Sequence, residues 1–229
     1  MSVHIAEATS REHLLQQLRA KTLVPVQQLV DVHPALAGLL PDGGLRPGAA
    51  YQVTGGALLL ALLAEPSSAG AWCSVVGMPE FGAEAARNAG IALERLALVP
   101  EPGQRWLSVV AALAEVMGVV AVRPPARIGP ADANRLAARL RERGCVLLAC
   151  GEWPRVEASL SLGRGRWSGL GDGHGYLTGR EVEVTARTRH GLTRTARLVL
   201  PDRQGRLTEA ARPVPTEQAQ PTWGLRAVG

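Results

Sequence analysis

Residues 49–149 alternate between short apolar runs and segments with helical spacing. The apolar runs are Ala50–Val53, Trp72–Val76, Leu96–Val99, Val119–Val122 and Val146–Ala149. The helix-like segments between them are Ala57–Ala64, Glu84–Ala89, Trp106–Met117 and Pro130–Arg143. Short strands of almost continuous apolar character are typical of a parallel sheet that is buried on both faces. The pattern therefore predicts an α/β domain in which helices flank a mostly parallel sheet.

After Gly151 the pattern changes to a period of two. Strand-like runs occur at Leu160–Leu162, Arg166–Gly169, Glu181–Thr188 and Thr193–Leu200, separated by glycine turns. Within residues 181–188, Val182, Val184 and Ala186 alternate with polar residues, which indicates a strand with one buried face. We therefore expect antiparallel edge strands on the C-terminal side of the sheet.

The N-terminal residues carry an apolar stripe with helical spacing. Ser10 is a helix cap, and Leu14, Leu15 and Leu18 lie on one face of the helix that follows it. This face is a candidate for docking, either on its own domain or on a neighbouring protein.

The last residues have the composition of a disordered tail. From Thr208 onward the chain is rich in Ala, Pro, Thr, Gln and Glu. Trp223 and Leu225 in this segment either fold back on the domain or form a short motif that docks into a partner's groove. We divide the chain into an N-terminal helical docking segment (1–48), a core (49–207) and a disordered C-terminal tail (208–229).

Charge is distributed unevenly along the 229 residues. Residues 1–122 carry seven basic and ten acidic side chains, whereas residues 123–229 carry eighteen basic and ten acidic ones. All but one of the basic residues are arginine, as a GC-rich genome would favour, but that bias does not explain the asymmetry. A basic half suggests an anionic partner, most commonly nucleic acid.

Six residues of the basic half are candidates for contact with single-stranded DNA, through phosphate contacts and base stacking. They are Arg164, Arg166, Trp167, Arg187, Arg189 and Arg194. The alternative is that Gly163–Trp167 is an ordinary loop between edge strands and that the arginines belong to solvated faces. The residues alone leave both interpretations open.

Several classes of protein are disfavoured. No apolar run reaches the ~18 residues needed to cross a membrane. The first residues lack the pattern of a secretory leader, which predicts a cytoplasmic protein. Cys73, Cys145 and Cys150 are odd in number and have no zinc-ligand spacing, and the histidines are scattered. We expect no metal site.

The segment around Gly55 has the skeleton of a phosphate-binding loop without its chemistry. A strand, a Gly55-Gly56 turn and a helix follow one another, but the turn continues into Ala57 and three leucines. A working loop reads G-x-x-x-x-G-K-[ST], with the lysine on the phosphates and the hydroxyl on Mg²⁺. The single lysine, Lys21, lies well upstream. We therefore expect a degenerate phosphate loop at Thr54, Gly55 and Gly56.

The order of elements, this turn and one further segment resemble the core of the RecA recombinase fold. Residues 86–96 read A-R-N-A-G-I-A-L-E-R-L, similar to the recombinase pattern A-R-x-L-G-V-x-x-x-x-L. With residues 11–19, 45–56 and 160–201, the chain resembles the ImuA family of RecA/SulA-like mutasome accessory proteins, in its actinobacterial ImuA′ type. The resemblance covers roughly residues 10–201.

The resemblance implies a pseudo-ATPase. Arg123 follows the apolar strand at which the recombinase has its metal-side aspartate, and Met78 aligns with the catalytic glutamate. Glu80 lies two residues away, out of register. With the lysine also missing, nothing would position a γ-phosphate or neutralise its charge. We expect no ATP hydrolysis, no cofactor and no enzymatic activity.

The function that the resemblance implies is that of an adaptor in a DNA-damage-inducible translesion synthesis complex. Its expected partners are the inactive Y-family polymerase homologue ImuB, an error-prone replicative-type polymerase reached through it, and RecA. Two alternatives stay open: a basic module that binds single-stranded DNA, and a SulA-like inhibitor of cell division.

Overall fold

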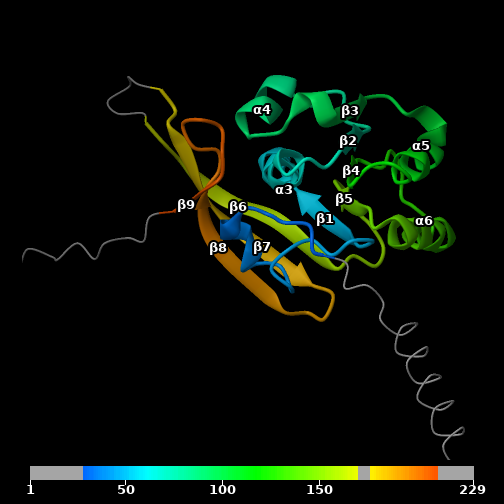
Figure 1. The fold of residues 1–229 in the computed structure, drawn as a ribbon. Coiled ribbons are helices and arrows are strands. Elements are labelled where there is room, and N and C mark those ends of the chain that lie inside the picture. The colour runs from blue at the N-terminus through cyan, green and yellow to red at the C-terminus, as the bar shows by residue number, and fades with distance from the viewer. Residues whose placement is uncertain (1–27, 170–175, 211–229) are drawn as a thin grey trace, which may run out of the picture.

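A computed structural model of the chain describes residues 28–169 and 176–210 (Figure 1). In these residues one sheet has the strand order β3-β2-β4-β5-β1-β6-β7-β8-β9. The strands are β1 (Ala50–Thr54), β2 (Cys73–Val76), β3 (Leu96–Val99), β4 (Val119–Val122), β5 (Val146–Ala149), β6 (Ala158–Ser168), β7 (Gly179–Thr188), β8 (Thr193–Val199) and β9 (Thr208–Glu209). The α-helices are α2 (Pro34–Ala37), α3 (Gly56–Ser68), α4 (Ala83–Asn88), α5 (Trp106–Leu113) and α6 (Pro130–Arg143).

The sheet is parallel from β3 to β6 and antiparallel from β6 to β9. Strand β1 pairs in parallel with both β5 and β6, and β4 pairs in parallel with β2 and β5. Strands β7, β8 and β9 then follow as antiparallel neighbours along one edge. The expected α/β architecture, with a mostly parallel sheet and antiparallel C-terminal strands, is confirmed.

Helices cover both faces of the parallel strands (Figure 1). In β4, Val119 and Ala121 belong to the hydrophobic cluster that contains the buried leucines of α3, while Val120 and Val122 pack with α5 and α6. All four side chains are buried. This two-sided burial explains why the central strands are apolar without alternation.

Helix α6 forms where its sequence predicts it. Pro130 occupies the first turn, where its missing N–H costs no hydrogen bond. Leu136 and Leu140 are buried, and their spacing places both on one face. Gly144 ends the helix with a φ of 68°, a conformation that glycine adopts without a steric penalty.

Strand β6 corrects one prediction from the sequence. The expected strands 160–162 and 166–169, joined by a glycine loop, are a single strand with a bulge between Leu162 and Gly165. A Cβ atom on Gly165 would lie 2.5 Å from Nε of Arg180 and 3.0 Å from the carbonyl oxygen of Glu181. Glycine is therefore needed here for the close approach of β7 and not for a turn.

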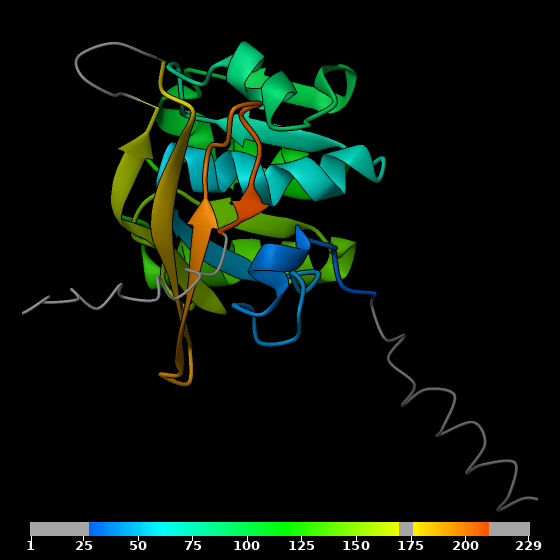
Figure 2. The same cartoon turned by 90° about the vertical axis from the view of Figure 1, so that its left-hand side faces the viewer.

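Both predicted domain boundaries are shifted by the structure. Residues 28–48, assigned to the docking segment, contribute Leu36, Leu39, Leu40 and Leu45 to the core, so this part belongs to the domain. Thr208 and Glu209, assigned to the tail, form β9 against β8. Figure 2 shows the segment before β9 approaching α3. All five docking candidates lie outside the described residues: Leu14, Leu15, Leu18, Trp223 and Leu225.

Candidate functional site

The turn at Thr54–Gly56 connects β1 directly to α3. We call it the phosphate turn, after the degenerate phosphate loop that the sequence predicts there. Gly55 has φ 112° and ψ 124°, and α3 begins at Gly56. A Cβ atom on Gly55 would lie 2.7 Å from Cδ1 of Leu162 on β6, so no other residue fits without displacing that side chain. Leu58 and Leu59, in the first turn of α3, are buried in the core. The first turn of α3 therefore contributes apolar side chains to the core.

Three segments that the sequence singles out meet at one small cavity. The carboxyl ends of β1, β2, β4 and β5 surround a space of about 150 Å³. It is lined by Gly55, Gly56, Leu59, Leu60, Met78, Glu80, Phe81, Gly82, Arg123 and Cys150. Open α/β sheets bind ligands in this place, outside the carboxyl ends of the strands. The volume is well below the ~300–1,000 Å³ of pockets that hold small ligands and cofactors.

An ion pair between Arg123 and Glu80 lies at the rim of this small cavity. Nη1 of Arg123 contacts Oε1 of Glu80, and the two side chains are 47% and 59% exposed. A hydrogen bond from the backbone and the Arg123 guanidinium both hold the pKa of the Glu80 carboxyl below its usual range. The carboxylate therefore stays ionised and engaged at neutral pH, which makes it a poor general base.

Backbone contacts fix the position of Arg123. Its N–H donates to the carbonyl of Val76 at 2.9 Å, and Gly77 donates to Val99 at 2.9 Å. Gly77 has a φ of 75°, and a Cβ atom there would lie 2.6 Å from the carbonyl oxygen of Arg123. The ends of β2 and β4 are therefore held tightly together beside the small cavity.

The three cysteines are free thiols, and none is suited to nucleophilic chemistry. Burial raises the pKa of Cys73 and of Cys145 to about 12 and that of Cys150 to about 11. Nucleophilic attack requires the thiolate, which these pKa values suppress at neutral pH. Cys150 lines the small cavity, but as a half-buried neutral group.

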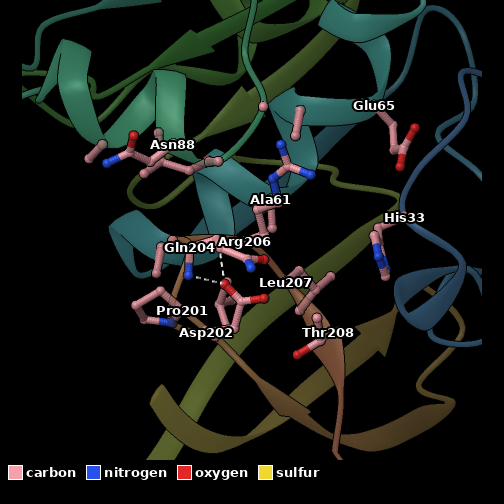
Figure 3. A pocket seen from close by; sticks show the side chains of 18 of the residues that line it. His33, Ala61, Glu65, Asn88, Pro201, Asp202, Gln204, Arg206, Leu207 and Thr208 are labelled. Atoms are coloured by element: carbon pink, nitrogen blue, oxygen red, sulfur yellow. Dashed lines mark hydrogen bonds between the residues drawn. The ribbon is translucent and has the colours of Figure 1, made fainter. Parts of the chain in front are cut away.

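A larger groove of about 780 Å³ separates α3 and α4 from the 200–208 segment (Figure 3). We call it the α3–α4 groove. Its lining includes Ala57, Leu60, Ala61, Ala64, Glu65, Ala85, Asn88, Leu200, Asp202, Arg206 and Leu207, together with His33. The small alanine side chains of α3 leave its floor open. The groove was not predicted, because it requires a segment 140 residues further along the chain to fold back over α3.

The polar groups of the α3–α4 groove that contact other groups serve local structure. Oδ1 of Asp202 accepts from the backbone N–H groups of Gln204 and Arg206, at 2.8 and 2.9 Å (Figure 3). Nδ1 of His33 accepts from the N–H of Ala35 at 3.2 Å and caps α2. These contacts shape a turn and a helix end. None of these contacts pairs a nucleophile with a base.

The six candidates for nucleic-acid contact fall into two groups. Arg164, Arg166 and Trp167 lie near the end of β6, and Arg187, Arg189 and Arg194 lie near the turn between β7 and β8. In the register Arg187 of β7 is opposite Ser159 of β6. Ser159 comes seven residues before Arg166 on that strand. At ~3.3 Å per residue the two groups are roughly 20 Å apart.

Neighbouring groups already engage several of these side chains. Arg189 forms an ion pair with Glu157 at 3.3 Å, and Trp167 lies under the guanidinium of Arg180, which is 5.9 Å from the ring centroid. Arg194 donates to the carbonyls of Gly38 and Leu40 at 3.2 and 2.7 Å, so it ties β8 to the end of α2. The six candidates therefore form two groups on the β6–β8 strands, and Trp167, Arg189 and Arg194 already have neighbouring partners.

The described residues hold no group of three or more His, Cys, Asp or Glu side chains placed to bind a metal ion. Within the same residues no helix is both long and apolar enough to cross a membrane.

Comparison with known proteins gives a family model and one relative. The model of the MT3502 N-terminal domain matches residues 38–155. This match includes the phosphate turn and the whole lining of the small cavity. The uncharacterized protein Rv3395c of Mycobacterium tuberculosis is 34% identical over 153 residues, which cover 64% of this chain and 74% of the relative.

Proposed function

This chain belongs to the family of the MT3502 N-terminal domain, and on that premise we propose that it is a non-catalytic adaptor of a translesion synthesis complex, of the ImuA′ type. In this proposal its sheet is a RecA-like core whose nucleotide site has lost its function. Its partner is an inactive Y-family polymerase homologue of the ImuB type, through which an error-prone replicative-type polymerase and RecA are reached.

The observation that carries the proposal is the small cavity at the carboxyl ends of β1, β2, β4 and β5. In an α/β sheet of this topology a nucleotide would bind there, beside the turn after β1. The space is about 150 Å³, and Arg123 places a cation where a metal-binding carboxylate would be needed. A γ-phosphate would have neither a cradling lysine nor a bound Mg²⁺ to neutralise it.

The strand order also supports a RecA-like core. Strand β1, which precedes the phosphate turn, lies between β5 and β6, and β4 with Arg123 at its end is one strand further away. The connection after β2 leads to β3 at the edge, and the connection after its neighbour β4 leads the opposite way to β5, so the small cavity lies where the connections diverge. Such switch points are where doubly wound sheets bind their ligands.

We expect the full chain to show no saturable binding of ATP with Mg²⁺. Isothermal titration at concentrations up to the millimolar range should give only the heat of dilution. Hydrolysis, measured as phosphate release, should equal that of the buffer. One-to-one binding of ATP, or turnover that Arg123→Ala abolishes, would contradict the loss of nucleotide chemistry.

The adaptor role predicts a stable complex with the polymerase homologue that depends on the segment after Ala210. Removing residues 211–229 leaves β9 intact, and we expect at least tenfold weaker binding with little change in melting temperature. Trp223→Ala should reproduce most of this loss, because a buried tryptophan is a frequent anchor of interfaces. Surface-immobilised partner and circular dichroism provide the two measurements.

The outcome of the same measurements separates the alternatives. Unchanged affinity after the deletion would remove the tail from the proposal. Co-purification with the cell-division machinery, and no binding to the polymerase homologue, would favour the SulA-like inhibitor instead. Steep loss of binding to single-stranded DNA with added salt would favour the DNA-binding module.

A further inference from the structure

We propose that a second hollow, which we call the arginine hollow, binds a compact phosphate group. The arginine hollow has a volume of about 510 Å³ and lies at the start of β1, at the opposite end of the strand from the phosphate turn. Its arginines are Arg46, Arg141, Arg155 and Arg189. This site goes beyond the adaptor role and does not depend on it.

The four arginines come from four separate parts of the chain. Arg46 precedes β1, Arg141 is on α6, Arg155 is in the connection from β5 to β6, and Arg189 is in the turn after β7. Small or short side chains, among them Gly48, Ala133 and Ala137, leave room between them. At Gly48 a Cβ atom would lie 2.6 Å from Cα of Arg141, so glycine allows the loop to pack against the helix.

One buried carboxylate holds two of these arginines. Glu157 is 9% exposed, and its carboxylate oxygens lie 3.6 Å from Nη1 of Arg46 and 3.3 Å from Nη1 of Arg189. Asp42 adds a second acidic contact to Arg46, at 2.6 Å. These four side chains form a structural ion-pair network that closes one wall of the arginine hollow.

Arg141 and Arg155 do not take part in that network. Within the described part of the chain neither has a carboxylate oxygen within 4.0 Å of its guanidinium, the distance that defines the other ion pairs. Nη1 of Arg155 donates to Oδ1 of Asn134 at 3.2 Å, and Asn134 also lines the arginine hollow. Four guanidinium groups therefore share two carboxylates, which leaves a local charge of two positive units for a ligand to neutralise.

The backbone of Arg155 is held in a strained conformation. Its φ is 57°, a left-handed value that is unfavourable for a residue with a Cβ atom. Among the described non-glycine residues no other has a positive φ. Strained backbone persists where the surroundings enforce it, and it is common at ligand sites. Here it places an arginine at the rim of a hollow that is already basic.

The shape of the arginine hollow favours a compact anion over an extended strand of nucleic acid. Sequence-independent binding of single strands needs exposed aromatic rings on which bases stack. Trp153 lines the arginine hollow, but it is 8% exposed and packs edge-on against Trp106, with ring centroids 6.4 Å apart. An arginine guanidinium can donate two parallel hydrogen bonds to the oxygens of one phosphate group. A compact phosphate also brings two negative charges to one place.

Inorganic pyrophosphate is the probe for a titration calorimetry test with the full chain. We expect saturable binding, one per chain, that weakens as salt rises from 50 to 200 mM. Arg141→Gln combined with Arg155→Gln should weaken it at least tenfold, equal to about 1.4 kcal/mol at 25 °C. These two positions are chosen because removing Arg46 or Arg189 would take one of its two partners from the buried Glu157.

A matched control removes the same charge elsewhere on α6. Arg135→Gln combined with Arg139→Gln takes away two exposed arginines that do not line the arginine hollow, and affinity should stay within twofold. Melting temperatures of both double variants verify that they fold. Absence of saturable binding to the native chain, or equal weakening by both pairs, would overturn the proposal.

Two labelled oligothymidylates, one with a 5′-phosphate and one with a 5′-hydroxyl, identify the source of the phosphate. Preference for the phosphorylated strand, relieved by pyrophosphate, assigns the site to a nucleic-acid end. Binding of pyrophosphate alone assigns it to a free phosphate compound, and either result supports the proposal. Equal binding of both strands without competition by pyrophosphate, or binding of a glutamate-rich peptide in place of pyrophosphate, refutes it.

Discussion

Replacing Gly77 by alanine will lower the free energy of unfolding by about 3 kcal/mol, one of the two largest effects that we expect of a single substitution here. A left-handed φ costs a residue with a Cβ atom roughly 1–2 kcal/mol. The new Cβ atom would also meet the carbonyl oxygen of Arg123 at 2.6 Å, and the strain of such overpacking adds about 1–3 kcal/mol. For a chain of this size the melting temperature should fall by about 6–12 °C.

Two other glycines separate these contributions. Gly103 has a φ of 62° with no atom within 4 Å of its Cβ position, so Gly103→Ala should show only the backbone cost. Gly38 has a φ of −63° and equally open space, and Gly38→Ala should be neutral or slightly stabilising. Chemical denaturation of the three variants gives the comparison. A Gly77 variant no less stable than the Gly103 variant would show that the contact with Arg123 is absent.

Truncating Leu148 to alanine will destabilise the domain by about 2–5 kcal/mol, the range for a leucine removed from a closed core. Leu148 is fully buried at the centre of β5, where the register places it opposite Tyr51 on β1 and Ala121 on β4. Neighbours on both sides and α3 above leave the site little freedom to collapse around the missing methyl groups. The midpoint of urea unfolding should fall without a change in slope.

Leu98→Ala on β3 is the matched control for this substitution. Leu98 is also a strand leucine, but it is 42% exposed at the edge of the sheet, so the change should stay within about 0.5 kcal/mol. Similar losses at the two positions would mean that β5 is not at the centre of a closely packed core.

Several elements could be predicted because their signals are local. The apolar runs at residues 119–122 and 146–149 end where the strands end, since burial on both faces demands a continuous run. Helix α6 carries its start and stop signals in Pro130 and Gly144. The same reasoning was wrong for strand β6, which it divided in two. The glycines at 163 and 165 have the pattern of a turn, but they are needed because β7 lies close to them.

The candidate site was partly predictable for a related reason. The missing lysine at the phosphate turn can be seen in the sequence, and so can Arg123 at the end of an apolar strand. The phosphate turn and Arg123 lie beside Met78 in one cavity, because parallel strands have their carboxyl ends at the same edge of a sheet. The ion pair of Arg123 with Glu80 depends on side-chain positions that no spacing rule contains.

By itself the sequence determined the α/β fold class and the course of the central strands, because both depend on neighbours along the chain. The tertiary structure alone decided which distant residues meet. It closed the space at the phosphate turn to about 150 Å³, placed the 200–208 segment over α3, and brought Arg46, Arg141, Arg155 and Arg189 around one hollow. Charges up to 143 positions apart leave no periodic trace in the sequence, since only the packing of sheet and helices sets the distances between them.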